Sequence, residues 1–200
     1  MKKDSQYMLK CLQLAERGRG AVEPNPMVGC VIVNGGRIVG RGWHQRYGGA
    51  HAEVEALREA GEKARGATVY VSLEPCNHFG KTPPCTEALL DADVRKVVIG
   101  MPDPNPDVMG AGARRLREAG ITVTENVERE RCEALNEVFL VNAVQKRPFV
   151  ILKVAQTIDG YIAALKGTSH WITSEESRTE VHRLRSLYDA VLVGAETIRK

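Results

Sequence analysis

The spacing of apolar residues along the chain predicts alternating helices and strands. Near the N-terminus, apolar side chains recur at every third or fourth position, which is the spacing of one helix face, and Asp4 or Ser5 is the expected N-cap. The runs 28–33 and 37–43 are joined by Asn34-Gly35-Gly36. They predict a β-hairpin, because glycine and asparagine tolerate the positive φ of tight turns.

The middle of the chain continues the alternation. The predicted helices cover residues 51–60, 85–91, 110–119 and 128–143, and the predicted strands cover residues 68–72, 96–100 and 121–125. Strands that alternate with short helices indicate an α/β fold, in which a sheet has parallel neighbours and helices on both faces.

A polar, proline-marked stretch at residues 145–148 is the expected domain boundary, which divides the chain into residues 1–146 and 147–200. Beyond it the pattern predicts strands over 149–155 and 190–194, a turn at Asp159-Gly160 and a helix over 174–187. Roughly 50 residues with two or three strands cannot bury a core alone. We therefore expect the second segment to be the N-terminal fragment of a larger domain.

Composition narrows the class of protein. The chain has 200 residues, of which 43% are hydrophobic and 26% charged, so it is neither a disordered tail, a fibre nor a coiled coil. The net charge is +3 without a long run of either sign, which gives no sign of a nucleic-acid or membrane-surface partner. No stretch approaches the roughly 18 apolar residues of a membrane span.

The five cysteines and the polar N-terminus indicate a compartment. No apolar signal-peptide region is visible after Met1, and an odd number of cysteines argues for reduced thiols, so we expect a cytoplasmic protein. In that compartment spaced cysteines more often indicate a metal or catalysis than a disulfide.

One histidine and two cysteines stand at positions that suit metal chemistry. His51-Ala52-Glu53 opens a predicted helix, Cys76 follows a predicted strand, and Cys85 opens the next helix. An imidazole and two thiolates are good ligands for Zn²⁺, which prefers nitrogen and sulfur in tetrahedral geometry. Three protein ligands leave the fourth position for water, which zinc converts to a hydroxide source near neutral pH. The pattern predicts a catalytic zinc site with ligands His51, Cys76 and Cys85.

Glu53 completes this pattern as the predicted catalytic residue. It lies two residues from His51 on the first helical turn, where it can reach the bound water without ligating the metal, as a general acid/base must. The zinc deaminases carry H-x-E followed by P-C-x-x-C. The first half matches here, but eight residues instead of two separate Cys76 from Cys85.

The main alternative is a closed structural zinc site with His78, Cys30 or Cys132 as the fourth ligand, which would leave the position of Glu53 without a reason. Outside such a site, Cys11, Cys30 and Cys132 are most simply small buried hydrophobic residues.

Short motifs around the candidate site and beyond it carry a family resemblance. They are Pro24–Gly29, Gly42–His44, Gly49–Glu53, Ser72–Thr86, Asp103–Pro106, Gly110–Gly112, Leu152–Ala155, Thr157–Gly160 and Ser169–Ser174. Together they resemble the RibD family of bifunctional riboflavin-biosynthesis proteins, which join a pyrimidine deaminase to a 5-amino-6-(5-phosphoribosylamino)uracil reductase. The eight-residue insert between the two cysteines is itself typical of that family's deaminase.

The resemblance implies a fold and a reaction. The first domain is expected to be a cytidine-deaminase-like three-layer α/β/α domain, and the second to be the start of a dihydrofolate-reductase-like α/β domain. The implied reaction removes the 2-amino group of 2,5-diamino-6-(5-phosphoribosylamino)pyrimidin-4(3H)-one by hydrolysis. Its products are 5-amino-6-(5-phosphoribosylamino)uracil and ammonia, and the full-length family member then reduces the ribosyl group with NADPH.

The resemblance also implies substrate contacts in the deaminase, namely Asn25, His44, His78 and Lys81. Amide and imidazole groups can recognise the edge of a ring, and a lysine and a histidine suit an anionic phosphate. The alternative for each of them is a loop residue that faces solvent.

In the second segment the family pattern places NADP(H) contacts and substrate contacts. The cofactor contacts are Ala155, Trp171 and Thr197, and the substrate contacts are Lys153, Ser169, Thr173 and Arg185. The alternatives are a core aromatic for Trp171 and an exposed helix charge for Arg185. The family's reductase continues well beyond residue 200 with its cofactor loop, so a complete reductase is not expected from these residues alone.

Two further classes of function remain open. A nucleic-acid deaminase that acts on a flipped base shares the His-Ala-Glu and Pro-Cys elements, but it would be expected to show P-C-x-x-C and a basic or aromatic docking surface. A non-catalytic, zinc-stapled interaction module would have no use for Glu53. We expect a small-molecule, phosphoribosylated pyrimidine substrate, no nucleic-acid or membrane partner, and a homo-oligomer.

Overall fold

The computed structural model of the chain describes residues 2–78, 83–105, 109–164 and 171–199. It divides into two compact units, Met1–Phe149 and Val150–Lys200. Within the described residues no helix is long and apolar enough to cross a bilayer.

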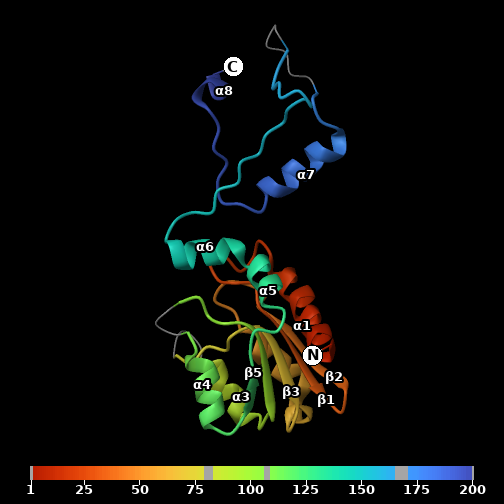
Figure 1. Cartoon of the computed structure of the whole chain (residues 1–200), viewed down its shortest axis with the longest axis vertical. Coiled ribbons are helices and arrows are strands. Elements are labelled where there is room, and N and C mark those ends of the chain that lie inside the picture. The colour runs from red at the N-terminus through yellow and green to blue at the C-terminus, as the bar shows by residue number, and fades with distance from the viewer. Residues whose placement is uncertain (1, 79–82, 106–108, 165–170, 200) are drawn as a thin grey trace. The chain divides into compact units, whose positions relative to one another are not determined.

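The first unit contains a five-stranded sheet with helices between its strands (Figure 1). In chain order its elements are α1 (Lys2–Ala15), the 3₁₀ helix η1 (Glu16–Gly18), β1 (Gly29–Asn34), β2 (Arg37–Trp43), α2 (Ala52–Ala60), the 3₁₀ helix η2 (Gly61–Ala64), β3 (Thr68–Leu73), α3 (Cys85–Asp91), β4 (Lys96–Met101), α4 (Ala111–Glu118), β5 (Thr122–Thr124), α5 (Arg129–Leu135) and α6 (Glu137–Gln145).

The strand order in the sheet is β2-β1-β3-β4-β5. β1 pairs antiparallel with both β2 and β3, whereas β3, β4 and β5 run parallel. The predicted hairpin and the predicted parallel neighbours are therefore confirmed. Helices connect the parallel strands because a chain must cross over to return in the same direction.

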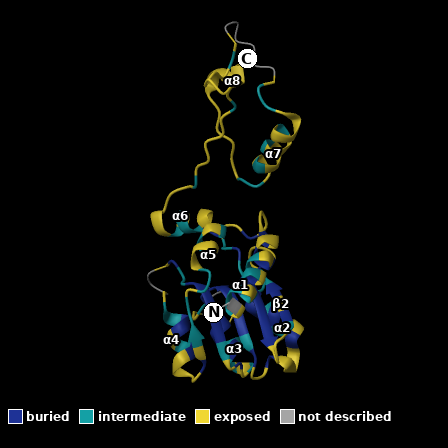
Figure 2. Cartoon of the chain, turned by 45° about the vertical axis from the view of Figure 1, so that its right-hand side comes forward, coloured by how far each residue is buried: buried dark blue, intermediate teal, exposed yellow. Residues whose placement is uncertain are grey.

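Side chains alternate between the two faces of the sheet and divide the core into two layers. Cys30, Ile32, Val69 and Val71 point to the face covered by α2, α3 and α4, whereas Val31, Val33 and Tyr70 pack against α1 and α5. The residues of the central strands are buried (Figure 2). Because helices cover these strands on both faces, their sequences are nearly continuous apolar runs. The result is a three-layer α/β/α unit.

Two glycines of β2 let helix α2 lie very close to the sheet. A Cβ atom at Gly42 would lie 2.1 Å from the carbonyl oxygen of Ala52, and one at Gly40 would lie 2.2 Å from that of Ala56. We expect Gly42→Ala to lower the free energy of unfolding by about 1–3 kcal/mol, because the helix must move off the sheet. Urea unfolding measures this change, and an unchanged midpoint would contradict the close packing.

Two local predictions need correction in the first unit. The predicted helix over 128–143 is two helices that break at Asn136, and the helix capped by Asp4 or Ser5 begins earlier, at Lys2. Asp4 lies inside α1, where it accepts a hydrogen bond from the Tyr70 hydroxyl at 2.7 Å. The Asp4 carboxylate therefore bonds to a tyrosine of the sheet and does not cap the helix, contrary to the prediction from the local sequence pattern.

The second unit contains two helices among its described residues, α7 (Glu175–Arg185) and α8 (Ala195–Arg199). The turn at Asp159-Gly160 is present, but the strands predicted over 149–155 and 190–194 are not formed. A strand needs a partner for its backbone N–H and C=O groups, and these two segments do not pair. No described residue of this unit is buried, which agrees with the expectation that it cannot build a core alone.

Candidate metal centre and active site

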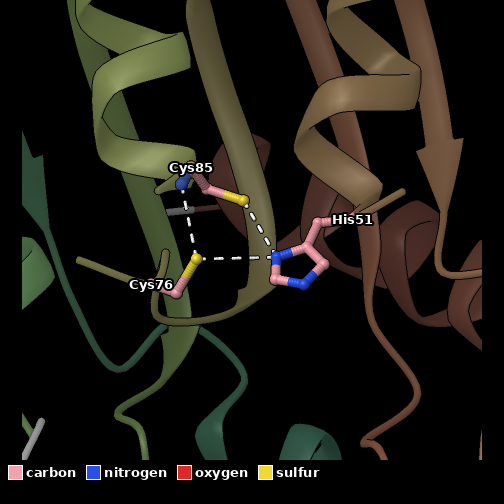
Figure 3. Close-up of side chains that lie close together, drawn as sticks. All are labelled: His51, Cys76 and Cys85. Carbon is pink, nitrogen blue, oxygen red and sulfur yellow. Dashed lines mark hydrogen bonds between the residues drawn. The ribbon is translucent and has the colours of Figure 1, made fainter. Parts of the chain in front are cut away.

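The three predicted metal ligands meet where one strand ends and two helices begin. His51 directly precedes α2, Cys76 follows β3, and Cys85 is the first residue of α3. Figure 3 shows the three side chains turned toward one another. Cys76 and Cys85 follow His51 by 25 and 34 positions in the sequence. The three residues converge because α2 and α3 pack side by side on the same face of the sheet.

The donor atoms have a geometry that suits zinc. The His51 Nδ1 atom lies 3.1 Å from Cys85 Sγ and 3.5 Å from Cys76 Sγ, and the three donors lie within 4.8 Å of one another. Tetrahedral zinc, with bonds of about 2.0 Å to nitrogen and about 2.3 Å to sulfur, separates two such donors by roughly 3.6 Å. The donor set and its spacing therefore fit Zn²⁺.

Electrostatics at the cluster favour a thiolate. Hydrogen bonds with Cys85 and His51 lower the pKa of Cys76 to about 4, against the effect of its burial. The pKa of Cys85 is raised, because the Cys76 thiolate holds its proton and because the side chain is buried. The hydrogen bond to Cys76 likewise raises the pKa of His51. A thiolate is the form of cysteine that binds a metal.

Glu53 lies on the first turn of α2, buried beside this cluster. Its side chain is 4% exposed, and burial raises its pKa to about 7. The carboxyl group hydrogen-bonds with Cys85 but is not one of the converging donors. It is thus a carboxyl group next to the metal ligands that can hold or release a proton near neutral pH.

The alternative of a closed site finds no fourth ligand among the described residues. The possible ligands that converge there are His51, Cys76 and Cys85 alone. Cys132 packs on the opposite face of the sheet, and His78 is exposed. Cys11, Cys30 and Cys132 are fully buried and form no disulfide, as expected if they are small hydrophobic core residues.

Asn25 and His44 lie together next to the cluster. Asn25 Nδ2 is 3.0 Å from His44 Nε2, and His44 Nδ1 is 3.0 Å from the carbonyl oxygen of Ala50. The rings of His44 and His51 meet edge to face, with centroids 5.9 Å apart. His44 is buried, and both of its ring nitrogens already have hydrogen-bond partners. It therefore holds the Asn25 side chain and has no free ring nitrogen to offer a ligand.

The other predicted contacts are less closely grouped. His78 is exposed, and Lys81 and Ser169 lie outside the described residues. Trp171 is 70% exposed and stacks under the Arg178 guanidinium, so it is not a core aromatic. Of the remaining residues assigned to the reductase, Ala155 and Thr173 are half-buried, and Lys153, Arg185 and Thr197 are exposed.

Glu74, next to the cysteine ligand loop, is a residue that sequence reasoning missed. Its buried carboxylate accepts hydrogen bonds from the backbone N–H groups of Asp103 at 3.2 Å, Gly110 at 2.9 Å and Ala113 at 3.1 Å. It ties the end of β3, just before Cys76, to the segment that leads into α4. No short-range pattern indicates contacts over 29 to 39 residues.

We expect Glu74→Gln to lower the free energy of unfolding by about 1–3 kcal/mol, because the new amide NH₂ faces backbone donors and leaves at least one without an acceptor. Urea unfolding with the exposed Glu118→Gln as matched control measures this. The control variant should stay within about 0.5 kcal/mol of the unmodified chain. Equal effects of the two substitutions would contradict the role of Glu74.

A three-layer α/β/α unit with His, Cys and Cys donors and a glutamate at the start of a helix defines the class of the zinc-binding deaminases. Residues 1–101 match the family described as the cytidine and deoxycytidylate deaminase zinc-binding region. The chain belongs to this family. Residues 148–200 match a second family, the RibD C-terminal domain.

Known relatives extend the similarity over nearly the whole chain. The riboflavin biosynthesis protein RibD of Synechocystis sp. is 52% identical over 197 residues, which cover 98% of this chain and 54% of that protein. RibD of Aquifex aeolicus is 51% identical over 98% of this chain and 55% of its own length. The chain thus spans about half the length of these curated relatives.

A solved structure agrees with the sequence comparison. It is the diaminohydroxyphosphoribosylaminopyrimidine deaminase/5-amino-6-(5-phosphoribosylamino)uracil reductase of Thermotoga maritima, which is 47% identical. The TM-score is 0.92, and the match covers 100% of this chain and 57% of that protein. The predicted cytidine-deaminase-like fold is confirmed, and so is the resemblance to RibD.

Proposed function

We propose that the chain is a zinc-dependent deaminase of 2,5-diamino-6-(5-phosphoribosylamino)pyrimidin-4(3H)-one. The observation that carries this proposal is the convergence of His51, Cys76 and Cys85 beside the buried Glu53. The substrate class is supported by the name of the Thermotoga maritima relative, which is 47% identical. The reaction belongs to riboflavin biosynthesis, as do the relatives named RibD.

The residues at the site suit hydrolysis of an amidine. His51, Cys76 and Cys85 would hold Zn²⁺, which lowers the pKa of water and supplies a nucleophile near neutral pH. Glu53 accepts the proton of the attacking water and delivers it to the ring nitrogen. A C–O bond forms at the ring carbon and the C–N bond to the amino group breaks. Glu53 then takes the remaining proton of the added hydroxyl group and passes it to the departing amine, so that ammonia leaves and the ring carbon becomes a carbonyl.

The remaining contacts follow from the same proposal. Asn25, held by His44, would recognise the ring edge, and His78 and Lys81 would bind the ribosylamino-phosphate end. For the longer protein we propose NADPH-dependent reduction of the deaminated product. There the cofactor contacts would include Ala155, Trp171 and Thr197, and the substrate contacts Lys153, Ser169, Thr173 and Arg185.

Ammonia release by the purified chain, with zinc and without NADPH, tests the function. We expect release from the diaminopyrimidinone phosphoribosyl compound and little from cytidine or dCMP. Release from dCMP alone would replace the proposed substrate by another pyrimidine. Failure with all three compounds, at about one zinc per chain, would contradict a deaminase that works within these 200 residues.

A further inference from the structure

Asn136, at the break between α5 and α6, holds both backbone groups of one residue in a distant loop. Its Oδ1 accepts a hydrogen bond from the Met27 N–H at 2.8 Å, and its Nδ2 donates to the Met27 carbonyl at 3.0 Å. The side chain is 2% exposed and lies 109 positions away in sequence. A buried two-point contact of this kind fixes the position and the rotation of the loop backbone.

The loop fixed by Asn136 is the one that carries Asn25. The Asn25 N–H donates to the Val22 carbonyl at 2.9 Å, and one residue beyond Met27 the Val28 carbonyl accepts from the His44 N–H at 2.9 Å. The Asn25 side chain thus reaches His44 from a backbone that is anchored on both sides.

The His44 ring decides which end of the Asn25 amide is presented to a ligand. The Ala50 carbonyl can only accept a hydrogen bond, so His44 Nδ1 carries a proton, and in the neutral imidazole Nε2 is then the acceptor. Nε2 therefore receives the Asn25 Nδ2–H group, and the amide oxygen Oδ1 is left as the acceptor for a substrate amino or ring N–H group.

We propose that Asn136 is a positioning residue for substrate binding, which acts through Met27 on the amide of Asn25. The proposal rests on the proposed deaminase function. It makes the start of α6 part of the deaminase site, although this helix lies beyond the 1–101 match to the deaminase family.

A double-mutant cycle separates this role from a structural one. We expect Asn136→Ala to reduce kcat/KM by roughly 100-fold, mainly through KM, with zinc content unchanged, because the misplaced amide loses its hydrogen bond to the substrate. In an Asn25→Ala background the same substitution should cost less than about threefold. Effects that multiply in the double variant would overturn the proposal. Asn142 is an exposed residue of α6, and Asn142→Ala is the matched control. Its kcat/KM should equal that of the unmodified chain.

A second measurement does not need turnover. Asn136→Asp keeps the size and the acceptor for the Met27 N–H but removes the donor to its carbonyl. We expect the ¹⁵N–¹H resonances of the Asn25 side-chain amide, assigned by their loss in Asn25→Ala, to shift in this variant. Unchanged resonances in a folded Asn136→Asp protein would overturn the positioning role. If the unmodified chain releases no ammonia, the proposed function fails, whereas this spectrum still decides the role of Asn136.

Discussion

Replacement of Glu53 by glutamine is expected to reduce ammonia release by about 10²–10⁴-fold and to leave the zinc content unchanged. The substitution keeps the size of a side chain that is 4% exposed, but glutamine cannot accept the proton of the attacking water. Because Glu53 is not one of the converging donors, the metal should remain bound. Steady-state kinetics and elemental analysis of the purified variant measure the two quantities.

Glu55→Gln on the same helix is the matched control. Glu55 is half-buried, forms an ion pair with Arg58 and is not one of the converging donors, so its replacement should change neither turnover nor zinc content. If Glu53→Gln kept full activity, Glu53 would not be the acid/base. If it also lost zinc, Glu53 would belong to the ligand set. The same two variants distinguish an enzyme from a zinc-stapled interaction module. In such a module Glu53→Gln would change neither the zinc content nor the function.

Loss of one cysteine donor is expected to abolish both metal binding and turnover. Cys85 is fully buried and lies 3.1 Å from His51 Nδ1, so Cys85→Ala leaves two donors for an ion that needs three protein ligands in a catalytic site. We expect zinc to fall from about one per chain to a small fraction and activity to fall with it. Chelation of the unmodified chain should have the same effect, and added Zn²⁺ but not Mg²⁺ should reverse it.

Cys132→Ala provides the comparison for this experiment. Cys132 is equally buried but packs on the opposite face of the sheet, so its replacement is expected to lower stability and to keep the zinc. A Cys85→Ala protein that retains zinc, or an active metal-free chain, would contradict the assignment of the ligands.

Local signals in the sequence predicted most of the first unit. The hairpin over 28–43 has an apolar run on each side of an asparagine-glycine turn, and the helix predicted over 85–91 has those bounds in the structure. The second unit shows the limit of such signals. The apolar runs at 149–155 and 190–194 have strand composition, but a strand forms only where a neighbouring strand completes its hydrogen bonds.

The candidate site divides in the same way. The residue types and order of His51, Glu53, Cys76 and Cys85 were enough to predict a metal cluster, because the chemistry needs those donors and each stands at the end of a recognisable element. Glu74 and Asn136 left no such signal. Both bond to backbone N–H groups far along the chain, and any residue except proline at positions 27, 103 or 110 would offer such a group.

The most direct test of the central claim is turnover in water enriched in oxygen-18. In the proposed reaction His51, Cys76 and Cys85 would hold zinc and Glu53 would act as the acid/base, and the oxygen of water is added to the ring carbon as ammonia leaves. We predict that the uracil product of the zinc-loaded chain carries one labelled oxygen, as detected by mass spectrometry, and that Glu53→Gln forms at least about 100-fold less of this product in the same time. Product without the label, or no deaminated product from the zinc-loaded chain, would contradict the account.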